Sequence, residues 1–189
     1  MSSFLKTGFS IIDIFSIEEH QIISKTIKKA INERLNAIAV NRLFLNDLKD
    51  YHNLNLTDDF HQQVVDASTR CIDFNNFSAN IKKNNSIKQI MDECWDHHEF
   101  RLIWVGNLKN DEVKENYASF RIARPNLLND VGGIHLDKHV GSVKNLGDEN
   151  LLTIWLPIVG FNEKYTLNFA PGSHLYDHPD NFIEEDSNY

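Results

Sequence analysis

The sequence predicts an α+β fold, in which helices pack on one side of a mostly antiparallel sheet. Two observations carry this prediction. In the first half of the chain, apolar residues recur every three to four positions, as on amphipathic helices. From residue 99 onward they alternate with polar residues or form short runs between turn residues, which is typical of strands. Helices first and strands second favour α+β. We therefore expect one domain, with helices over residues 1–98, a sheet over residues 99–175 and an acidic tail over residues 176–189.

Composition limits the classes of function. The 189 residues are 41% hydrophobic and 24% charged, as in an ordinary globular domain. A net charge of −8 argues against a nucleic-acid partner, because binding phosphates needs a basic face. The longest apolar run, 151–161, is too short to span a membrane, and no signal peptide opens the chain, so we expect a cytoplasmic protein without a membrane partner. Cys71 and Cys94 are expected in reduced form at apolar positions of helices.

The first half predicts a short strand and three helices. Residues 8–15 are β-branched and aromatic, as in a strand. Ser16 and Glu19 then form a capping box that starts the first helix. Its buried stripe is expected to contain Ile23, Ile27, Ala30, Ile31 and Leu35. A second helix is expected to begin after Thr57 and to continue towards Phe74. Ser86 and Gln89 predict a second capping box, followed by an apolar stripe of Ile87, Ile90, Met91, Cys94 and Trp95.

The second half predicts five strands separated by turn residues. They are expected at 100–105, 117–123, 133–137, 151–159 and 165–169. Successive side chains of a strand point to opposite faces. In the fourth strand, Thr153 and Trp155 therefore share one face, and Ile154 and Leu156 share the other.

His135 and Asp137 carry the strongest chemical signal. Two residues apart on a strand, their side chains point to the same face. An imidazole and a carboxylate presented in this way are two of the three ligands of a mononuclear iron site. A Gly-Gly pair precedes them, which lets the backbone approach a ligand closely. The other His-x-Asp sequence, at 178–180, has a central proline and predicts a surface turn.

Further motifs surround this pair. The chain opens with Gly-Phe-Ser-Ile-Ile-Asp at 8–13 and Ser-Ile-Glu-Glu-His at 16–20, and it carries Trp-Leu-Pro-Ile at 155–158 and Pro-Gly-Ser-His at 171–174. With these motifs the chain resembles the phytanoyl-CoA dioxygenase-like family from about residue 8 to residue 174. The resemblance implies a double-stranded β-helix (jelly-roll) core, Fe(II), 2-oxoglutarate as cosubstrate and hydroxylation of a small organic molecule. His135 and Asp137 match the family's first two iron ligands.

The resemblance leaves the third ligand open. In the family it is a histidine on a later strand, followed by an arginine that binds the cosubstrate, and this sequence contains neither segment. The chain is then a shortened form of a longer enzyme, or His174 or His178 substitutes as ligand, or the protein is a non-catalytic jelly-roll binding protein. A metal-dependent cupin-type isomerase is a further alternative. Unpaired strand edges would favour a homodimer.

Four other residues are candidates for the cosubstrate or substrate pocket. Arg121 and Arg124 precede a Pro-Asn turn, where a guanidinium can bind a carboxylate through two parallel hydrogen bonds. The alternative for both is a surface salt bridge. Thr153 and Trp155 share a strand face and are candidates for the pocket wall; the alternative for Trp155 is the core.

Overall fold

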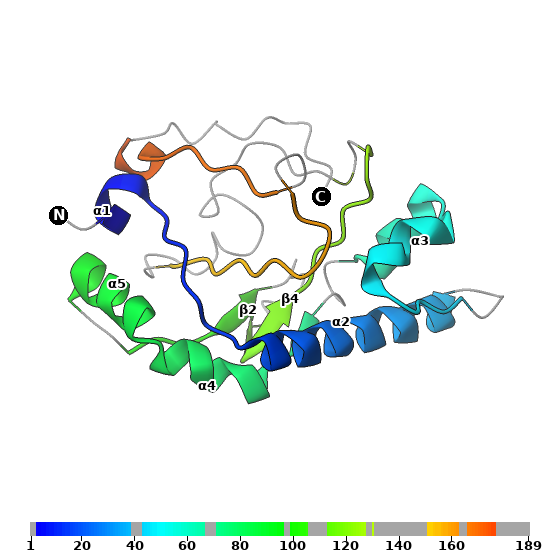
Figure 1. Ribbon diagram of the computed structural model, residues 1–189, viewed down its shortest axis with the longest axis horizontal. Coiled ribbons are helices and arrows are strands. Elements are labelled where there is room, and N and C mark those ends of the chain that lie inside the picture. The colour runs from blue at the N-terminus through cyan, green and yellow to red at the C-terminus, as the bar shows by residue number, and fades with distance from the viewer. Residues whose placement is uncertain are drawn as a thin grey trace.

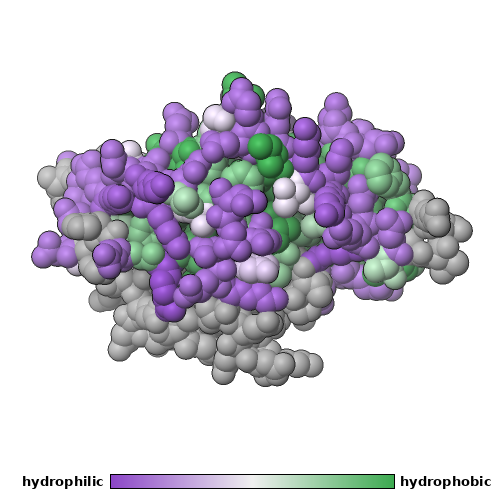
Figure 2. Space-filling view, turned by 90° about the horizontal axis from the view of Figure 1, so that it is seen from below, coloured by the Kyte–Doolittle hydropathy of each residue, from purple (hydrophilic) through white to green (hydrophobic). Residues whose placement is uncertain are grey.

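The computed structural model describes residues 3–38, 43–66, 71–96, 99–105, 113–127, 130, 151–162 and 166–176. Within these residues the protein is α+β, as predicted, with helices and two small antiparallel sheets (Figure 1). In Figure 1, α4 (Asn75–Lys83) lies below the strands, α5 (Asn85–Trp95) lies to their left, and α2 (Ile17–Ile38) runs from beside them to the right. The face seen from below is mostly hydrophilic (Figure 2), because the apolar side of the helices faces the core.

The capping box at the start of α2 is confirmed. The Ser16 N–H donates to Glu19 Oε2 at 2.8 Å, and the Glu19 N–H donates to Ser16 Oγ at 3.2 Å. The predicted stripe is confirmed too: the buried apolar residues of α2 are Ile23, Ile27, Ile31 and Leu35, and Ala30 packs beside them. The local sequence therefore determines where α2 begins and which of its faces is buried.

Shorter helices complete the first half. They are α1 (Ser3–Thr7), the 3₁₀ helix η1 (Leu48–Leu54) and α3 (Asp58–Val64). Thr57 caps α3 as predicted, because its Oγ1 accepts the Phe60 N–H at 3.4 Å. The predicted extension of this helix towards Phe74 is wrong, since α3 ends at Val64 and Cys71 lies on a strand. Of the two cysteines, which are both free, only Cys94 is helical.

Helices α4 and α5 follow one another directly. Sequence analysis missed α4, and it placed the cap of α5 two residues too late. The cap is Asn84, whose Oδ1 accepts the N–H groups of Ser86 and Ile87 at 3.0 and 3.2 Å, so the predicted capping box of Ser86 and Gln89 is wrong. The apolar stripe of α5 is confirmed, with Ile87, Ile90 and Met91 buried.

Each of the two sheets has two antiparallel strands. Strand β1 (Cys71–Asp73) pairs with β4 (Tyr117–Ser119), and β2 (Ile103–Val105) pairs with β3 (Val113–Glu115). Asn116 joins β3 to β4 with a left-handed φ of 57°, which asparagine tolerates. The predicted strands at 100–105 and 117–123 therefore exist but are shorter. The described strands do not by themselves form the jelly-roll core that the resemblance implies.

Three other predicted strands are wrong. Residues 8–15 and 151–159 run without regular secondary structure. Their alternation is nevertheless real, because Ile12, Ile14, Leu152, Ile154, Leu156 and Ile158 all pack against the core. Residues 166–169 are likewise not a strand. Alternation reports which side chains are buried, and it does not report whether the backbone has a hydrogen-bonded neighbour. The predicted strand at 133–137 lies outside the described residues.

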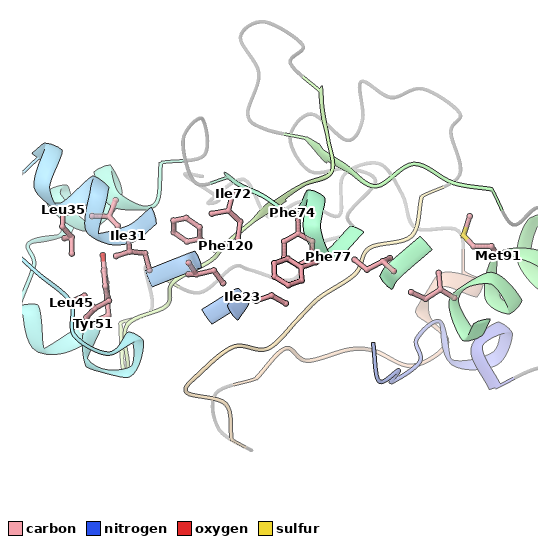
Figure 3. Packing of buried hydrophobic residues seen from close by; sticks show 14 residues of the cluster. Ile23, Ile31, Leu35, Leu45, Tyr51, Ile72, Phe74, Phe77, Met91 and Phe120 are labelled. Atoms are coloured by element: carbon pink, nitrogen blue, oxygen red, sulfur yellow. The ribbon is translucent and has the colours of Figure 1, made fainter. Parts of the chain in front are cut away.

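One hydrophobic core joins these elements. Figure 3 shows side chains of α2 between Leu45 and Tyr51 at one end and Phe74 and Phe77 at the other. The beginning of the chain also lies against its last described residues (Figure 1). The Gly172 N–H donates to the Thr7 carbonyl at 2.9 Å, and the rings of Phe9 and Phe169 stack at 5.4 Å. In the described ranges, no helix combines the length and the apolar character that crossing a membrane requires.

Candidate functional site

The predicted metal ligands are only partly covered by the structure. His135 and Asp137 lie outside the described residues, so their role stays a prediction, and so does that of His178. His174 lies in the 3₁₀ helix η5 (Ser173–Leu175) and is exposed. Its Nε2 is 3.2 Å from the Leu5 carbonyl oxygen of α1. Among the described residues, no three His, Cys, Asp or Glu side chains come close enough to hold a metal ion.

The Pro-Gly turn before His174 is confirmed. The Ser173 N–H donates to the Ala170 carbonyl at 3.1 Å, and Gly172 has φ 79° and ψ −2°, as in the third position of a type II turn. The ring of His174 then lies against Gly8, where an added Cβ would be 2.4 Å from the His174 Nδ1. The turn therefore places the side chain of His174 against α1.

Three of the four predicted pocket residues are at the surface. Arg121 and Thr153 are exposed, and Trp155 is 40% exposed with its ring packed edge-on against Phe161 at 4.9 Å. Thr153 and Trp155 share a face, as predicted, and this face points away from the core. Their placement in a pocket stays a prediction.

Arg124 is different, because it is only 8% exposed and fully engaged inside the protein. Its Nε–H and one Nη2–H donate to the two oxygens of Asp130 at 2.7 and 2.8 Å, in the bidentate geometry of a guanidinium–carboxylate pair. Nη2 also donates to Asp58 Oδ1 at 2.8 Å, and Nη1 donates to the Leu56 carbonyl at 3.2 Å. The carboxylate of a substrate would have to displace Asp130 to bind this arginine. The alternative of a salt bridge is therefore confirmed for Arg124, but the guanidinium is buried and does not lie at the surface.

The local sequence explains how Asp130 reaches Arg124. Pro125 and Asn126 form a turn in which the Leu127 N–H donates to the Arg124 carbonyl at 3.4 Å, and Asn126 has a φ of 63°. The Asp130 N–H then donates to the Leu127 carbonyl at 3.2 Å. As a result the Asp130 carboxylate returns to the start of the turn, where it also accepts the Arg124 backbone N–H at 2.7 Å.

His61 and Tyr51 extend this network into the core. His61 Nε2 lies 3.3 Å from Asp130 Oδ2, and His61 Nδ1 forms a hydrogen bond of 3.1 Å with the Tyr51 hydroxyl. His61 is 1% exposed, and Tyr51 is buried as well. A neutral imidazole with its proton on Nε2 suits both contacts. The proton is directed at the carboxylate, while Nδ1 accepts from the tyrosine hydroxyl.

Burial and charge set the protonation states of these four groups. Burial lowers the pKa of His61, and the negative Asp130 only partly opposes this shift. Burial alone would raise the pKa of Asp130, but hydrogen bonds from the Arg124 side chain and backbone hold it below its ordinary value. Burial raises the pKa of Tyr51 strongly, and the hydrogen bond to Asp130 raises that of Arg124. At neutral pH the network therefore contains one buried ion pair beside a neutral histidine and a neutral tyrosine.

The network links η1, α3, Arg124 and Asp130. Its Tyr-His-Asp chain contains the groups of an acid–base relay, but its side chains are buried and directed at one another. The arrangement therefore suits holding backbone segments together better than binding a substrate.

Sequence analysis missed Tyr51, His61 and Asp130. On α3 His61 is buried, whereas the neighbouring Phe60 is 37% exposed. Two sequence features could have predicted that His61 is buried: the helix cap at Thr57, and the apolar Val64, which lies three residues after His61 on the same helix face. No local signal identified Asp130, whose partner His61 lies 69 positions away. Comparisons of the chain with protein-family models, curated proteins and solved structures found no match.

Proposed function

We propose that this protein is an Fe(II)- and 2-oxoglutarate-dependent oxygenase with a jelly-roll core that hydroxylates a small organic molecule. The observation that carries the proposal is the His135-x-Asp137 motif, followed by the Pro-Gly-Ser-His motif in the order of the phytanoyl-CoA dioxygenase-like family. The α+β fold and the tight turn at Pro171 and Gly172 support it.

The donor set fits the metal. Neutral imidazole and carboxylate are the ligand types of mononuclear iron sites that keep positions open for cosubstrate and O₂. His135 and Asp137 would supply two of these ligands. The chemistry supplied by the bound metal and 2-oxoglutarate is oxidation of a C–H bond by O₂, coupled to decarboxylation of 2-oxoglutarate to succinate and CO₂. The chain's own contribution is to hold the ligands in place and to orient the substrate, for which Thr153 and Trp155 remain candidates.

The chain provides its own matched control for the test. Mn(II) serves as a stable substitute for Fe(II), and its binding is measured by electron paramagnetic resonance in the wild type, His135→Ala and His52→Ala. Both variants remove one histidine, and His52 is exposed on η1, with no role in the proposed site. We expect His135→Ala to weaken Mn(II) binding at least about tenfold and His52→Ala to leave it unchanged. Equal effects of the two variants would contradict the assignment.

Turnover separates the alternatives. With Fe(II), ascorbate and candidate substrates, the proposal expects succinate to form from 2-oxoglutarate in the wild type and not in His135→Ala. Metal binding without consumption of 2-oxoglutarate would favour the cupin-type isomerase. Absence of metal binding would favour the non-catalytic binding protein.

A further inference from the structure

We propose that the cavity between helix α2 and residues 43–46 binds a small anionic ligand that carries an aromatic ring. Lys25 and Lys29 would hold the anion, and the ring of the ligand would stack on Phe44. The site consists of described residues alone, and it is independent of the proposed oxygenase function.

Positive charge gathers at this cavity. Three lysines line it, Lys25, Lys28 and Lys29, together with one acidic residue, Glu33. The lining therefore has a net charge of +2, although the whole chain has a net charge of −8. Residues three and four positions apart are neighbours on a helix surface, so the lysines share one face of α2. A positive lining attracts anions locally, even on a protein that is negative as a whole.

Two of the three lysines are available to a ligand. Lys25 forms no ion pair within the part of the chain that the structure describes. Lys29 Nζ lies 3.8 Å from Glu33 Oε1, and both side chains are largely exposed, so this ion pair is weak and can be exchanged for a ligand. Lys28 already has a structural contact, because its Nζ donates to the Asn46 carbonyl at 3.0 Å. We therefore assign the anion to Lys25 and Lys29.

Phe44 supplies an aromatic ring to the same cavity. It is 62% exposed and lies outside the hydrophobic core, whereas Leu43 and Leu45 on either side of it belong to the core or pack against it. An exposed ring beside cations offers a face on which a second ring can stack. The cavity volume of about 260 Å³ lies just below the range of about 300–1,000 Å³ for drug-sized ligands, which suits a ligand with a small ring system and one anionic group.

The wall that carries Phe44 is fixed to the helix before any ligand binds. Buried Asn32 of α2 accepts the Leu45 N–H at 2.7 Å and donates to the Leu45 carbonyl at 3.0 Å. The contact of Lys28 holds the next residue, Asn46. A cavity with walls held in this way needs little ordering when a ligand binds, which favours affinity.

Three probes separate the two features of the ligand. 1-Naphthyl phosphate has both the ring and the anion, 1-naphthol lacks the anion, and inorganic phosphate lacks the ring. Binding is followed by backbone amide signals in nuclear magnetic resonance titrations of the full chain. For a ligand of about 15 non-hydrogen atoms we expect a Kd of about 1 mM or tighter, with shifts in α2 and residues 43–46. The other two probes should bind at least about twofold more weakly, and added salt should weaken the binding of 1-naphthyl phosphate.

Lys25→Gln and Lys83→Gln form a matched pair for the test. Each removes one positive charge from an exposed helix position, but Lys83 lies on α4 and does not line the cavity. We expect Lys25→Gln to weaken the binding of 1-naphthyl phosphate about two- to fivefold, and Lys83→Gln to leave it unchanged. Glu33→Gln should strengthen binding, because it removes the negative charge of the lining and releases Lys29. Phe44→Leu keeps an apolar side chain but removes the ring, and it should weaken binding about two- to tenfold.

Several results would overturn the proposal. They are a lack of saturable binding of 1-naphthyl phosphate, amide shifts confined to other parts of the chain, and equal effects of Lys25→Gln and Lys83→Gln. Inorganic phosphate that binds as tightly as 1-naphthyl phosphate would also contradict it, because the ring would then have no role. All four substituted side chains are exposed, so the variants are expected to fold. The titrations contain neither metal nor 2-oxoglutarate, so their outcome leaves the proposed oxygenase function unaffected.

Discussion

Replacing Arg124 by methionine is expected to destabilise the fold strongly, because it leaves the Asp130 carboxylate buried without its partner. The side chain of Asp130 is 0% exposed and takes three hydrogen bonds from Arg124. Breaking a buried ion pair in this way costs about 3–5 kcal/mol, whereas typical domains are stable by only about 5–15 kcal/mol. Asp58→Ala removes the exposed partner of the same arginine and should cost at most about 1 kcal/mol. Urea denaturation followed by tryptophan fluorescence measures both differences.

The sign of the pH dependence gives this prediction a second test. In the wild type the pKa of Asp130 lies below 3.8, because hydrogen bonds from Arg124 outweigh the effect of burial. Without Arg124, burial raises this pKa in the folded state above that of the unfolded chain. The stability of Arg124→Met should then fall as pH rises above about 4, and its deficit relative to wild type should grow towards neutral pH.

The double variant Arg124→Met/Asp130→Leu supplies the control for this reasoning. It removes both charges, so the penalty for an unpaired buried carboxylate disappears, and much of the lost stability should return. A single variant within about 1 kcal/mol of wild type would show that the pair behaves as a surface salt bridge. A double variant no more stable than the single one would show that packing, and not the unpaired charge, causes the loss.

Three further outcomes follow from single contacts. Because burial lowers the pKa of His61 in the folded state, the unfolded chain binds more protons, and the free energy of unfolding should fall on acidification below about pH 6.5. His61→Gln should make the urea midpoint depend less on pH in this range. Asn32 forms hydrogen bonds with both the N–H and the carbonyl of buried Leu45. Asn32→Ala should therefore lower the free energy of unfolding by about 2–4 kcal/mol in urea denaturation. Asn36→Ala, on the exposed surface of the same helix, should lower it by less than about 0.5 kcal/mol. Ser16→Ala removes half of the confirmed capping box and should lower stability by about 1 kcal/mol, measured as a shift in thermal midpoint, with exposed Ser10→Ala as the control without effect.

Several predictions that depend on neighbouring residues in the sequence were confirmed, whereas the predicted capping box of Ser86 and Gln89 was wrong. The capping box at Ser16, the stripe of α2 and the cap at Thr57 each involve residues within one or two helical turns. Helix α4 was missed because its segment is rich in asparagine and its N-cap residue, Phe74, has no side chain that can cap a helix. Residues 151–159 have the alternating pattern of a strand. A strand also needs a neighbouring strand for its backbone hydrogen bonds, and the sequence of the segment does not show whether one is present.

The candidate site shows the same limit. Arg124 stood out in the sequence because a guanidinium before a Pro-Asn turn can meet a carboxylate, and in the structure it does. That carboxylate comes from Asp130 in the same chain, and His61 reaches it from a helix 63 residues before Arg124. Local patterns identify a residue's chemistry, and only tertiary structure selects its partner.

The buried network lacks the properties that an oxygenase centre needs. A centre that activates O₂ and binds a substrate needs open coordination positions and access for small molecules. The Tyr51, His61 and Asp130 chain has the opposite properties, because its side chains are enclosed and already directed at one another. The network therefore suits holding η1, α3 and the backbone at Arg124 together. The oxygenase chemistry that we propose is assigned to the His135-x-Asp137 motif from the sequence alone.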